Sequence, residues 1–238
     1  WDATKPEGDM LIRVIQLRGL KRGISALRFS PDGKSLALVG QDDGHTLFVL
    51  ADWRAGPRGG VFSRETGTAK VLDVAFGGDG VVATVDVRAV RFWTMEGRGL
   101  RGRRGVLGKR GRQQPFVTCA FFGGQLVVGT ATGRLYLFDV ESGKLADKLK
   151  AHTGGAVNTL YVANKTTIAS GGRDGLVKVC SWIWPMSVDS PLAIDLTMPS
   201  SEMLISFASA GMTIASARAR PFGSTRLPLA SVVKLPVR

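Results

Sequence analysis

The chain has 238 residues, 44% of them hydrophobic, which is enough to bury a substantial core and excludes a disordered tail. Lys and Arg number 32 against 19 Asp and Glu, so the formal net charge is +13 at pH 7 and the favoured partners are polyanions. Charge by itself does not choose between nucleic acid, an anionic membrane and an acidic protein surface.

One strand pattern occurs four times along the chain. It reads ISALRF from Ile24, VLDVAF from Val71, FVTCAF from Phe116 and VNTLYV from Val157, with starts 47, 45 and 41 residues apart. Apolar residues alternate with variable ones inside each copy, and this period of two predicts a β-strand. The first two copies run into SPDG and GGDG, whose Pro, Asp and Gly residues favour tight turns.

A second and a third strand are expected after each copy. The second strands read SLALVG, VVATVD, QLVVGT and TTIASG, and the third read TLFVL, AVRFW, RLYLF and LVKVC. The third strands end at Leu50, Trp93, Phe138 and Cys180, which are 43, 45 and 42 residues apart. No stretch of helical period interrupts the pattern, so we predict an all-β chain built from a repeat of three to four strands.

Repeats of about 40 to 45 residues with four short strands each are typical of β-propeller blades. We therefore predict a WD-repeat β-propeller of about four blades, each a four-stranded antiparallel sheet. The blades occupy residues 1–183, with repeats at about 11–53, 54–95, 96–140 and 141–183. Residues 184–238 show no clear continuation and are expected to be a degenerate blade, a linker or an artefactual terminus.

Closure of a propeller commonly takes seven WD repeats, so four predict an incomplete propeller or a fragment with exposed strand edges. The dipeptide Trp1-Asp2 has the form of the end of a further blade. We accordingly expect other parts of the same propeller, or a second propeller, to lie outside this chain.

The last repeat carries three polar residues typical of WD repeats: His152, Ser170 and Asp174. In such repeats they share a buried hydrogen-bond network with a Trp, but here Cys180 stands where that Trp is usual, so we expect a shortened or slack network. His152 is interpreted as a structural residue of the blade rather than a catalytic base or a ligand.

The stretch GRGLRGRRGVLGKRGRQQ, which begins at Gly97, holds seven basic residues and no acid. It lies between the third strand of one repeat and the first strand of the next, and RRGVLG within it is expected to form an outer fourth strand. A charge run is often only a solvated face, but in a chain at +13 this one favours a contact with an acidic partner. The candidate binding residues are Arg98, Arg101, Arg103, Arg104, Lys109, Arg110 and Arg112.

The first six letters of this stretch also fit the dinucleotide-binding pattern G-x-G-x-x-G. That pattern needs a helix N-terminus after the glycines to hold the pyrophosphate. Three more glycines and a proline follow here, which leaves no room for a helix of usable length, so we reject a nucleotide site.

No constellation of catalytic residues is visible. The chain has only two histidines, His45 and His152, and no H-E-x-x-H, Walker or G-x-S-x-G pattern. The neighbouring carboxylates Asp42 and Asp43 fall in QDDGH, a turn between predicted strands. We expect no enzyme activity, no catalytic residue, no metal site and no cofactor.

Cysteine usage and hydropathy address the compartment. Cys119 and Cys180 do not form the dense, even spacing of a disulfide scaffold, which favours a reduced intracellular setting. No apolar run approaches the roughly 20 residues that span a bilayer, and the N-terminus lacks a signal-peptide profile. We expect a soluble protein without a membrane partner.

The run AVRFWTMEGRGLRGRRGVLGKRGRQQPFVTCAFFGGQLVVGTATGRLYLF resembles the echinoderm microtubule-associated protein-like family. Members carry F-W-T-L-E-G, then a basic G-x-F-G-K loop and a F-V-x-C-x-x-F strand. GISALRFSPDGKSLALVGQDDGHTLFVLADW resembles the preceding blade and AHTGGAVNTLYV the following one, so the likeness runs from Trp1 to about Trp182. The departures are Leu50-Ala51 in place of Trp-Asp, Cys180 in place of Trp, and the absence of the family's hydrophobic motif and coiled coil.

The resemblance implies tandem propellers that associate with microtubules and tubulin, in the cytoplasm and cytoskeleton and in some lineages at cilia or axonemes. Our leading hypothesis is a non-catalytic microtubule-associated WD-repeat protein that binds tubulin, or another acidic protein surface, through basic surface loops. The alternative is a generic WD-repeat scaffold for protein complexes. Nucleic-acid binding is less favoured, because the aromatic residues are assigned to core positions and no stacking platform is apparent.

Overall fold

The computed structural model describes residues 14–97, 99–182, 205–207 and 212–218. These residues form 17 β-strands and two short 3₁₀ helices, so the all-β prediction is confirmed for them. The chain divides into two compact units, residues 1–104 and 105–238, which are described separately. The predicted blade end at Trp1-Asp2 lies outside the described residues.

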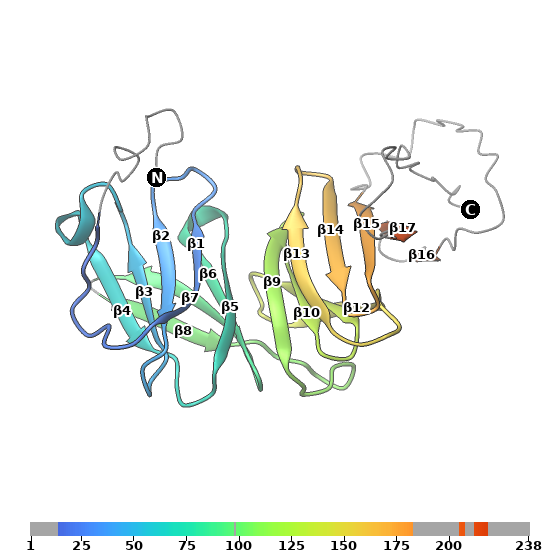
Figure 1. Cartoon of the computed structure of the whole chain (residues 1–238), viewed down its shortest axis with the longest axis horizontal. Helices are drawn as coiled ribbons and strands as arrows, with labels where there is room; N and C mark the ends of the chain where they lie inside the picture. Colours follow the sequence, from blue (N-terminus) through green and yellow to red (C-terminus); the bar gives the residue numbers. More distant parts are fainter. Residues whose placement is uncertain (1–13, 98, 183–204, 208–211, 219–238) are drawn as a thin grey trace. The chain divides into compact units, whose positions relative to one another are not determined.

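The first unit holds two four-stranded antiparallel sheets (Figure 1). The first sheet has the order β1-β2-β3-β4, and its strands are β1 (Ile24–Phe29), β2 (Leu36–Gly40), β3 (Thr46–Leu50) and β4 (Val61–Glu65). The second has the order β5-β6-β7-β8, with β5 (Val71–Phe76), β6 (Val82–Asp86), β7 (Val90–Glu96) and β8 (Gly99–Arg104). Each strand pairs with its neighbour in sequence.

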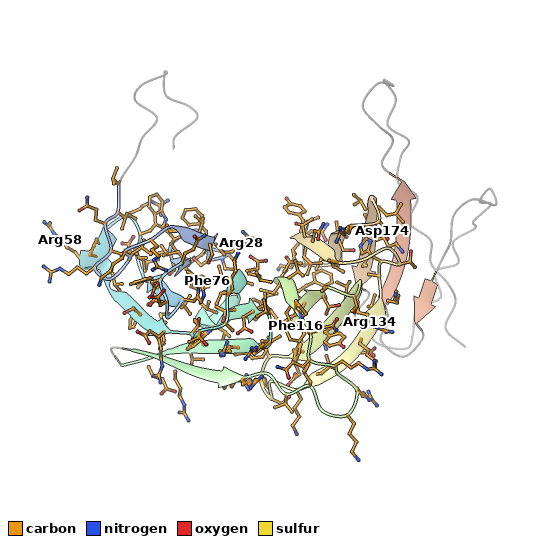
Figure 2. All side chains as sticks on the ribbon, turned by 60° about the horizontal axis from the view of Figure 1, so that its bottom comes forward. Arg28, Arg58, Phe76, Phe116, Arg134 and Asp174 are labelled. Carbon is orange, nitrogen blue, oxygen red and sulfur yellow. The ribbon has the colours of Figure 1, made fainter. Side chains whose placement is uncertain are left out.

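Alternating apolar side chains join these two sheets face to face. Their shared core contains Ala37, Val39, Leu47 and Val49 of the first sheet and Val71, Val74, Val82, Trp93 and Leu100 of the second. Burial of this apolar surface is the main stabilising contribution to the unit. Between β1 and β5, Arg28 Nη2 lies 3.2 Å from Asp73 Oδ1, and Arg28 is labelled in Figure 2.

The second unit also holds two antiparallel sheets. The third sheet consists of β9 (Phe116–Phe122), β10 (Gln125–Thr130), β11 (Arg134–Asp139) and β12 (Leu145–Lys150). The fourth consists of β13 (Val157–Val162), β14 (Thr167–Gly172), β15 (Leu176–Trp182), β16 (Ile205–Phe207) and β17 (Met212–Arg218), in the order β13-β14-β15-β17-β16. The core between them includes Val127, Leu135 and Leu137 from the third sheet and Leu160 and Cys180 from the fourth.

The sequence repeat and the sheet are offset by one strand. The repeat at 54–95 contains β4 together with β5, β6 and nearly all of β7, so it combines the outer strand of one sheet with the first three strands of the next. In the fourth sheet the outer positions are occupied by β17 and β16, which come from the C-terminal segment that follows residue 183.

Candidate functional site

The structure divides the predicted basic stretch between the two units. Arg101, Arg103 and Arg104 lie on β8 of the first unit, and the other three described cations precede β9 in the second; these are Lys109, Arg110 and Arg112. Arg98 lies outside the described residues. The stretch therefore provides two local basic surfaces, which we call the β8 surface (Arg101, Arg103, Arg104) and the loop surface (Lys109, Arg110, Arg112).

The outer strand of the second sheet begins earlier than RRGVLG, and that detail of the sequence interpretation was wrong. β8 covers Gly99–Arg104 because two contacts set its register against β7. Leu100 is 3% exposed and enters the core with Trp93, while Gly102 pairs with Trp93. A Cβ at Gly102 would lie 2.4 Å from Cζ3 of Trp93, so only glycine leaves room for this ring.

The arginines of the β8 surface are exposed at the outer edge of the second sheet. Arg101 Nη1 lies 3.2 Å from Glu96 Oε1, and because both side chains are more than half exposed this pair contributes little to stability. The Arg103 guanidinium lies 5.1 Å from the centre of the Phe92 ring, a cation–π contact. The three positive charges thus face solvent, and the exposed carboxylate of Glu96 pairs with Arg101.

The loop surface is anchored to the third sheet by its backbone. Val106 pairs with Lys144: Val106 N–H donates to the Gly143 carbonyl and Leu145 N–H to the Val106 carbonyl, both at 2.8 Å. Lys148 Nζ donates to the Arg110 carbonyl at 2.6 Å. These bonds hold the loop while its three cationic side chains remain exposed.

Cations on β12 and just before it were missed by the sequence analysis. Lys144, Lys148 and Lys150 are exposed, and the backbone bridge and the Lys148 bond place the first two beside the loop surface. The sequence signal was weak, because Glu141 and Asp147 alternate with these lysines along the chain. Only the fold brings them to the loop.

The structure brings His152, Ser170 and Asp174 together in the fourth sheet. His152 is fully buried; its Nδ1 lies 2.8 Å from Asp174 Oδ1 and its Nε2 lies 3.0 Å from Ser170 Oγ. A carboxylate only accepts, so Nδ1–H donates to Asp174, and Nε2 accepts from the Ser170 hydroxyl when the ring is neutral. Asp174, labelled in Figure 2, lies in the turn between β14 and β15.

The network lacks the usual Trp but its two central bonds have ordinary lengths, so it is shortened without being slack. Cys180 occupies the Trp position, opposite Ile168, and is fully buried in the apolar core. A Trp hydrogen bond of this kind is present in the second sheet, where Trp93 Nε1 donates to Thr84 Oγ1 at 2.9 Å. Trp93 is buried, as expected for a core aromatic residue, and its bond to Thr84 was not predicted from the sequence.

Two groups in the fourth sheet have shifted pKa values. Burial raises the pKa of the Asp174 carboxyl, but hydrogen bonds from His152 and from the backbone N–H of Leu176 lower it by more, so it lies below the usual 3.8. Burial raises the pKa of the Cys180 thiol to about 12, against a smaller opposing effect of the Lys178 charge. Cys180 is therefore a protonated thiol of low reactivity at neutral pH.

The G-x-G-x-x-G match has no nucleotide-binding geometry. Its last four residues, 99–102, belong to the antiparallel strand β8, whereas a dinucleotide cradle needs a turn into a helix. Asp42 is used locally in the β2–β3 turn, where it accepts from the Thr46 hydroxyl at 2.7 Å. Within the described residues no group of three or more His, Cys, Asp or Glu side chains could hold a metal ion.

Helices that could cross a membrane are absent from the part of the chain that the structure describes.

The family described as "WD domain, G-beta repeat" matches residues 143–181. Echinoderm microtubule-associated protein-like 2 of Homo sapiens is 28% identical over 191 residues, which cover 73% of this chain and 27% of that protein. Echinoderm microtubule-associated protein-like 1 of Rattus norvegicus is 23% identical over 72% of this chain and 21% of its own length. The chain thus spans about a quarter of the length of these relatives.

Two solved structures share the fold. The Cps50 (Swd1) β-propeller domain of Myceliophteria thermophila has a TM-score of 0.56 at 14% identity, covering 71% of this chain and 55% of that one. The computationally designed Ika4 protein has a TM-score of 0.54 at 24% identity, covering 70% and 96%. The WD-repeat β-propeller prediction is confirmed, and the chain is similar in sequence to the echinoderm microtubule-associated protein-like proteins.

Proposed function

We propose that this chain is a non-catalytic, microtubule-associated WD-repeat protein that binds the acidic surface of tubulin through its two basic surfaces. The observation that carries the proposal is the β8 surface together with the loop surface: six described cations, all exposed, on a chain with a net charge of +13. The similarity to relatives that are named microtubule-associated supports it. The proposed location is the cytoplasmic cytoskeleton, including cilia or axonemes where these are present.

The physical reason is electrostatic complementarity. Exposed arginines and lysines on a strand and on a backbone-anchored loop attract an acidic surface. The positions of these charges determine how the two proteins align and how fast they associate, more than how tightly they bind. Because the side chains are exposed, counter-ions screen them, and the attraction falls as ionic strength rises above about 0.1 M. The blades supply a rigid support for these side chains, which is a binding role without chemistry.

Co-sedimentation with polymerised microtubules across a salt series tests the proposal. The strand variant carries Gln at Arg101, Arg103 and Arg104, and the loop variant carries Gln at Lys109, Arg110 and Arg112. Three exposed ion pairs at about 0.5 kcal/mol each correspond to about a tenfold weaker affinity for either variant at low salt. The matched control, with Gln at Lys21, Lys70 and Lys165, removes the same charge from exposed positions elsewhere.

Retention of wild-type binding by the control, with loss in at least one of the other two variants, supports the proposal. Equal loss in all three would mean that net charge alone acts and that neither surface is a site. No pelleting at any salt concentration contradicts microtubule association and favours the scaffold alternative, and tighter binding to random RNA or DNA favours nucleic acid.

A further inference from the structure

The outer edges of both sheets in the second unit carry additional paired backbone. In the third sheet, Val106 pairs in parallel with Lys144 beside the start of β12, and Leu145 N–H donates to the Val106 carbonyl. In the fourth sheet, β16 pairs with β17, beyond the fourth-strand position. These edges show that the outer strand of a blade in this chain can accept a further extended segment.

The outer edge of β8 differs from them. β8 is the last strand in the order β5-β6-β7-β8, and within the described residues no strand or bridge pairs with its outer side (Figure 1). One outward bond is made, from Arg64 Nη1 to the Leu100 carbonyl at 3.2 Å. Because antiparallel backbone groups alternate in direction, the N–H and C=O of Gly102 and the N–H of Arg104 point outward as well. They form a row of backbone groups available for pairing.

The side chains of β8 select what can pair there. Arg101, Arg103 and Arg104 are exposed on a strand that carries no acid. A second β8 strand on this edge would bring arginines close to arginines, which is unfavourable. A strand of Glu or Asp residues would instead place opposite charges on neighbouring strands, and each such pair is favourable.

The other outer strands do not share this chemistry. β4 reads VFSRE and carries Arg64 beside Glu65, and β12 reads LADKLK and carries Asp147 beside Lys148. Mixed charge on those strands does not discriminate in favour of an acidic segment. Among the outer strands whose side chains the structure describes, β8 is the strand whose charged residues are all cations.

We propose that the outer edge of β8 binds an extended acidic protein segment as a fifth strand of the second sheet. Backbone hydrogen bonds to Gly102 and Arg104 supply affinity, and the three arginines select Glu- or Asp-rich sequences. The inference deepens the proposed function and rests on it for the source of the segment, an acidic stretch of the filament surface. The proposed function requires only charge, whereas strand addition also requires the backbone of the partner.

The test uses the full chain and a synthetic seven-residue peptide that alternates Glu and Thr. Two further peptides carry the same charge but are N-methylated, one at every Glu nitrogen and the other at every Thr nitrogen. In a β-strand the N–H groups of alternate residues point to the same side. One methylated peptide therefore loses its N–H donors toward β8 and places methyl groups against that strand, whereas the other keeps the N–H groups that face β8. We expect one to bind at least about tenfold more weakly than the parent and the other to bind like it.

Titration calorimetry at low salt gives the affinities, and ¹⁵N-labelled protein shows whether the Gly102 and Arg104 amides shift on binding. The strand variant is expected to bind the parent peptide about tenfold more weakly, and the loop variant to bind it as wild type does. Circular dichroism and the thermal midpoint establish that both variants are folded.

Equal binding by all three peptides, or no binding of the parent, overturns strand addition. Microtubule binding that persists in either case leaves the proposed function standing. Conversely, loss of binding by only one of the two methylated peptides supports strand addition even if the protein does not pellet with microtubules. In that case only the proposed microtubule-binding function is contradicted.

Discussion

Replacing Asp174 with Asn is the sharpest test of the polar network in the fourth sheet. The Asp174 side chain is 8% exposed and accepts from His152 Nδ1 at 2.8 Å and from the backbone N–H groups of Leu176 and Thr153, both at 3.2 Å. Asn keeps the shape and one acceptor oxygen, so His152 and Leu176 retain neutral bonds. Its amide group faces Thr153 N–H, which is also a donor, and that bond is lost.

The expected cost follows from these bonds. A hydrogen bond to a charged group contributes about 1.5–3 kcal/mol and a neutral one about 1 kcal/mol. Weakening two bonds, one of them buried, and losing a third at an exposed backbone N–H is expected to destabilise the protein by about 1–2 kcal/mol at pH 7. A surface control is Asp43→Asn, because Asp43 is 89% exposed and pairs with the exposed Arg22.

The stabilising contribution of Asp174 depends on pH. The pKa of Asp174 is lowered in the folded state, so its stabilisation is present above the usual value of 3.8 and is lost as pH falls through the lower folded value. Urea unfolding of both proteins at intervals from pH 7 to pH 2.5 is expected to show the difference in unfolding free energy shrinking below pH 3.8. Other carboxylates titrate in both proteins and cancel in this difference.

Two results would refute the reasoning. A difference at pH 7 no larger than that of Asp43→Asn would mean that the buried carboxylate contributes no more than a surface charge. A difference that stays constant down to pH 2.5 would mean that the pKa of Asp174 is not lowered by folding, and the bonds to His152, Thr153 and Leu176 would not be those of a charged acceptor.

Two further predictions concern close packing. Gly102→Val is expected to displace the Trp93 ring and cost about 1–3 kcal/mol in urea unfolding, whereas Gly99→Val at the strand end, where a Cβ meets nothing within 4 Å, serves as the control and is expected to cost less. Cys180→Trp introduces the residue usual in WD repeats, yet it is expected to destabilise by a similar amount because Cys180 is fully buried among Ile168 and its neighbours. For the Cys180 thiol, a pKa of about 12 predicts no reaction with an aromatic disulfide reagent at pH 8 until urea unfolds the protein. Because Cys119 is a second free thiol, the reaction is followed at Cys180 by peptide mapping, and rapid labelling of Cys180 in the folded state would contradict this.

Strand positions were predictable from local pattern, because alternation of apolar and variable residues is a property of a few consecutive positions. Leu27, Val74, Cys119 and Leu160 stand at the same position of the four strand copies. The last three are buried, whereas Leu27 is 47% exposed. The polar network of His152, Ser170 and Asp174 was equally predictable, because these residues stand at the spacing typical of WD repeats. In the structure the turn that contains Asp174 places its carboxylate beside His152. The family resemblance was inferred from phrases in the sequence, and the similarity to echinoderm microtubule-associated protein-like proteins confirms it.

The basic stretch shows where local pattern stops being informative. Its arginines and glycines have no alternating apolar signal, so the register of β8 depends on the fit of Trp93 over Gly102 and on burial of Leu100. Both contacts are made across the β7–β8 pair and with the first sheet, and neither can be seen in a window of neighbouring residues. The division of the six described cations into two surfaces follows from the same register.

Amino-acid order by itself determined that this chain forms repeated short strands, that its surface is strongly cationic and that it resembles a microtubule-associated family, because alternation, charge and motif phrases are local. Tertiary structure alone decided which cations lie together, that within the described residues no strand pairs with the outer edge of β8, and which polar groups meet. Lys148 donates to the Arg110 carbonyl, and Trp93 donates to Thr84, because the folded strands and loops bring together residues that are not neighbours in the sequence.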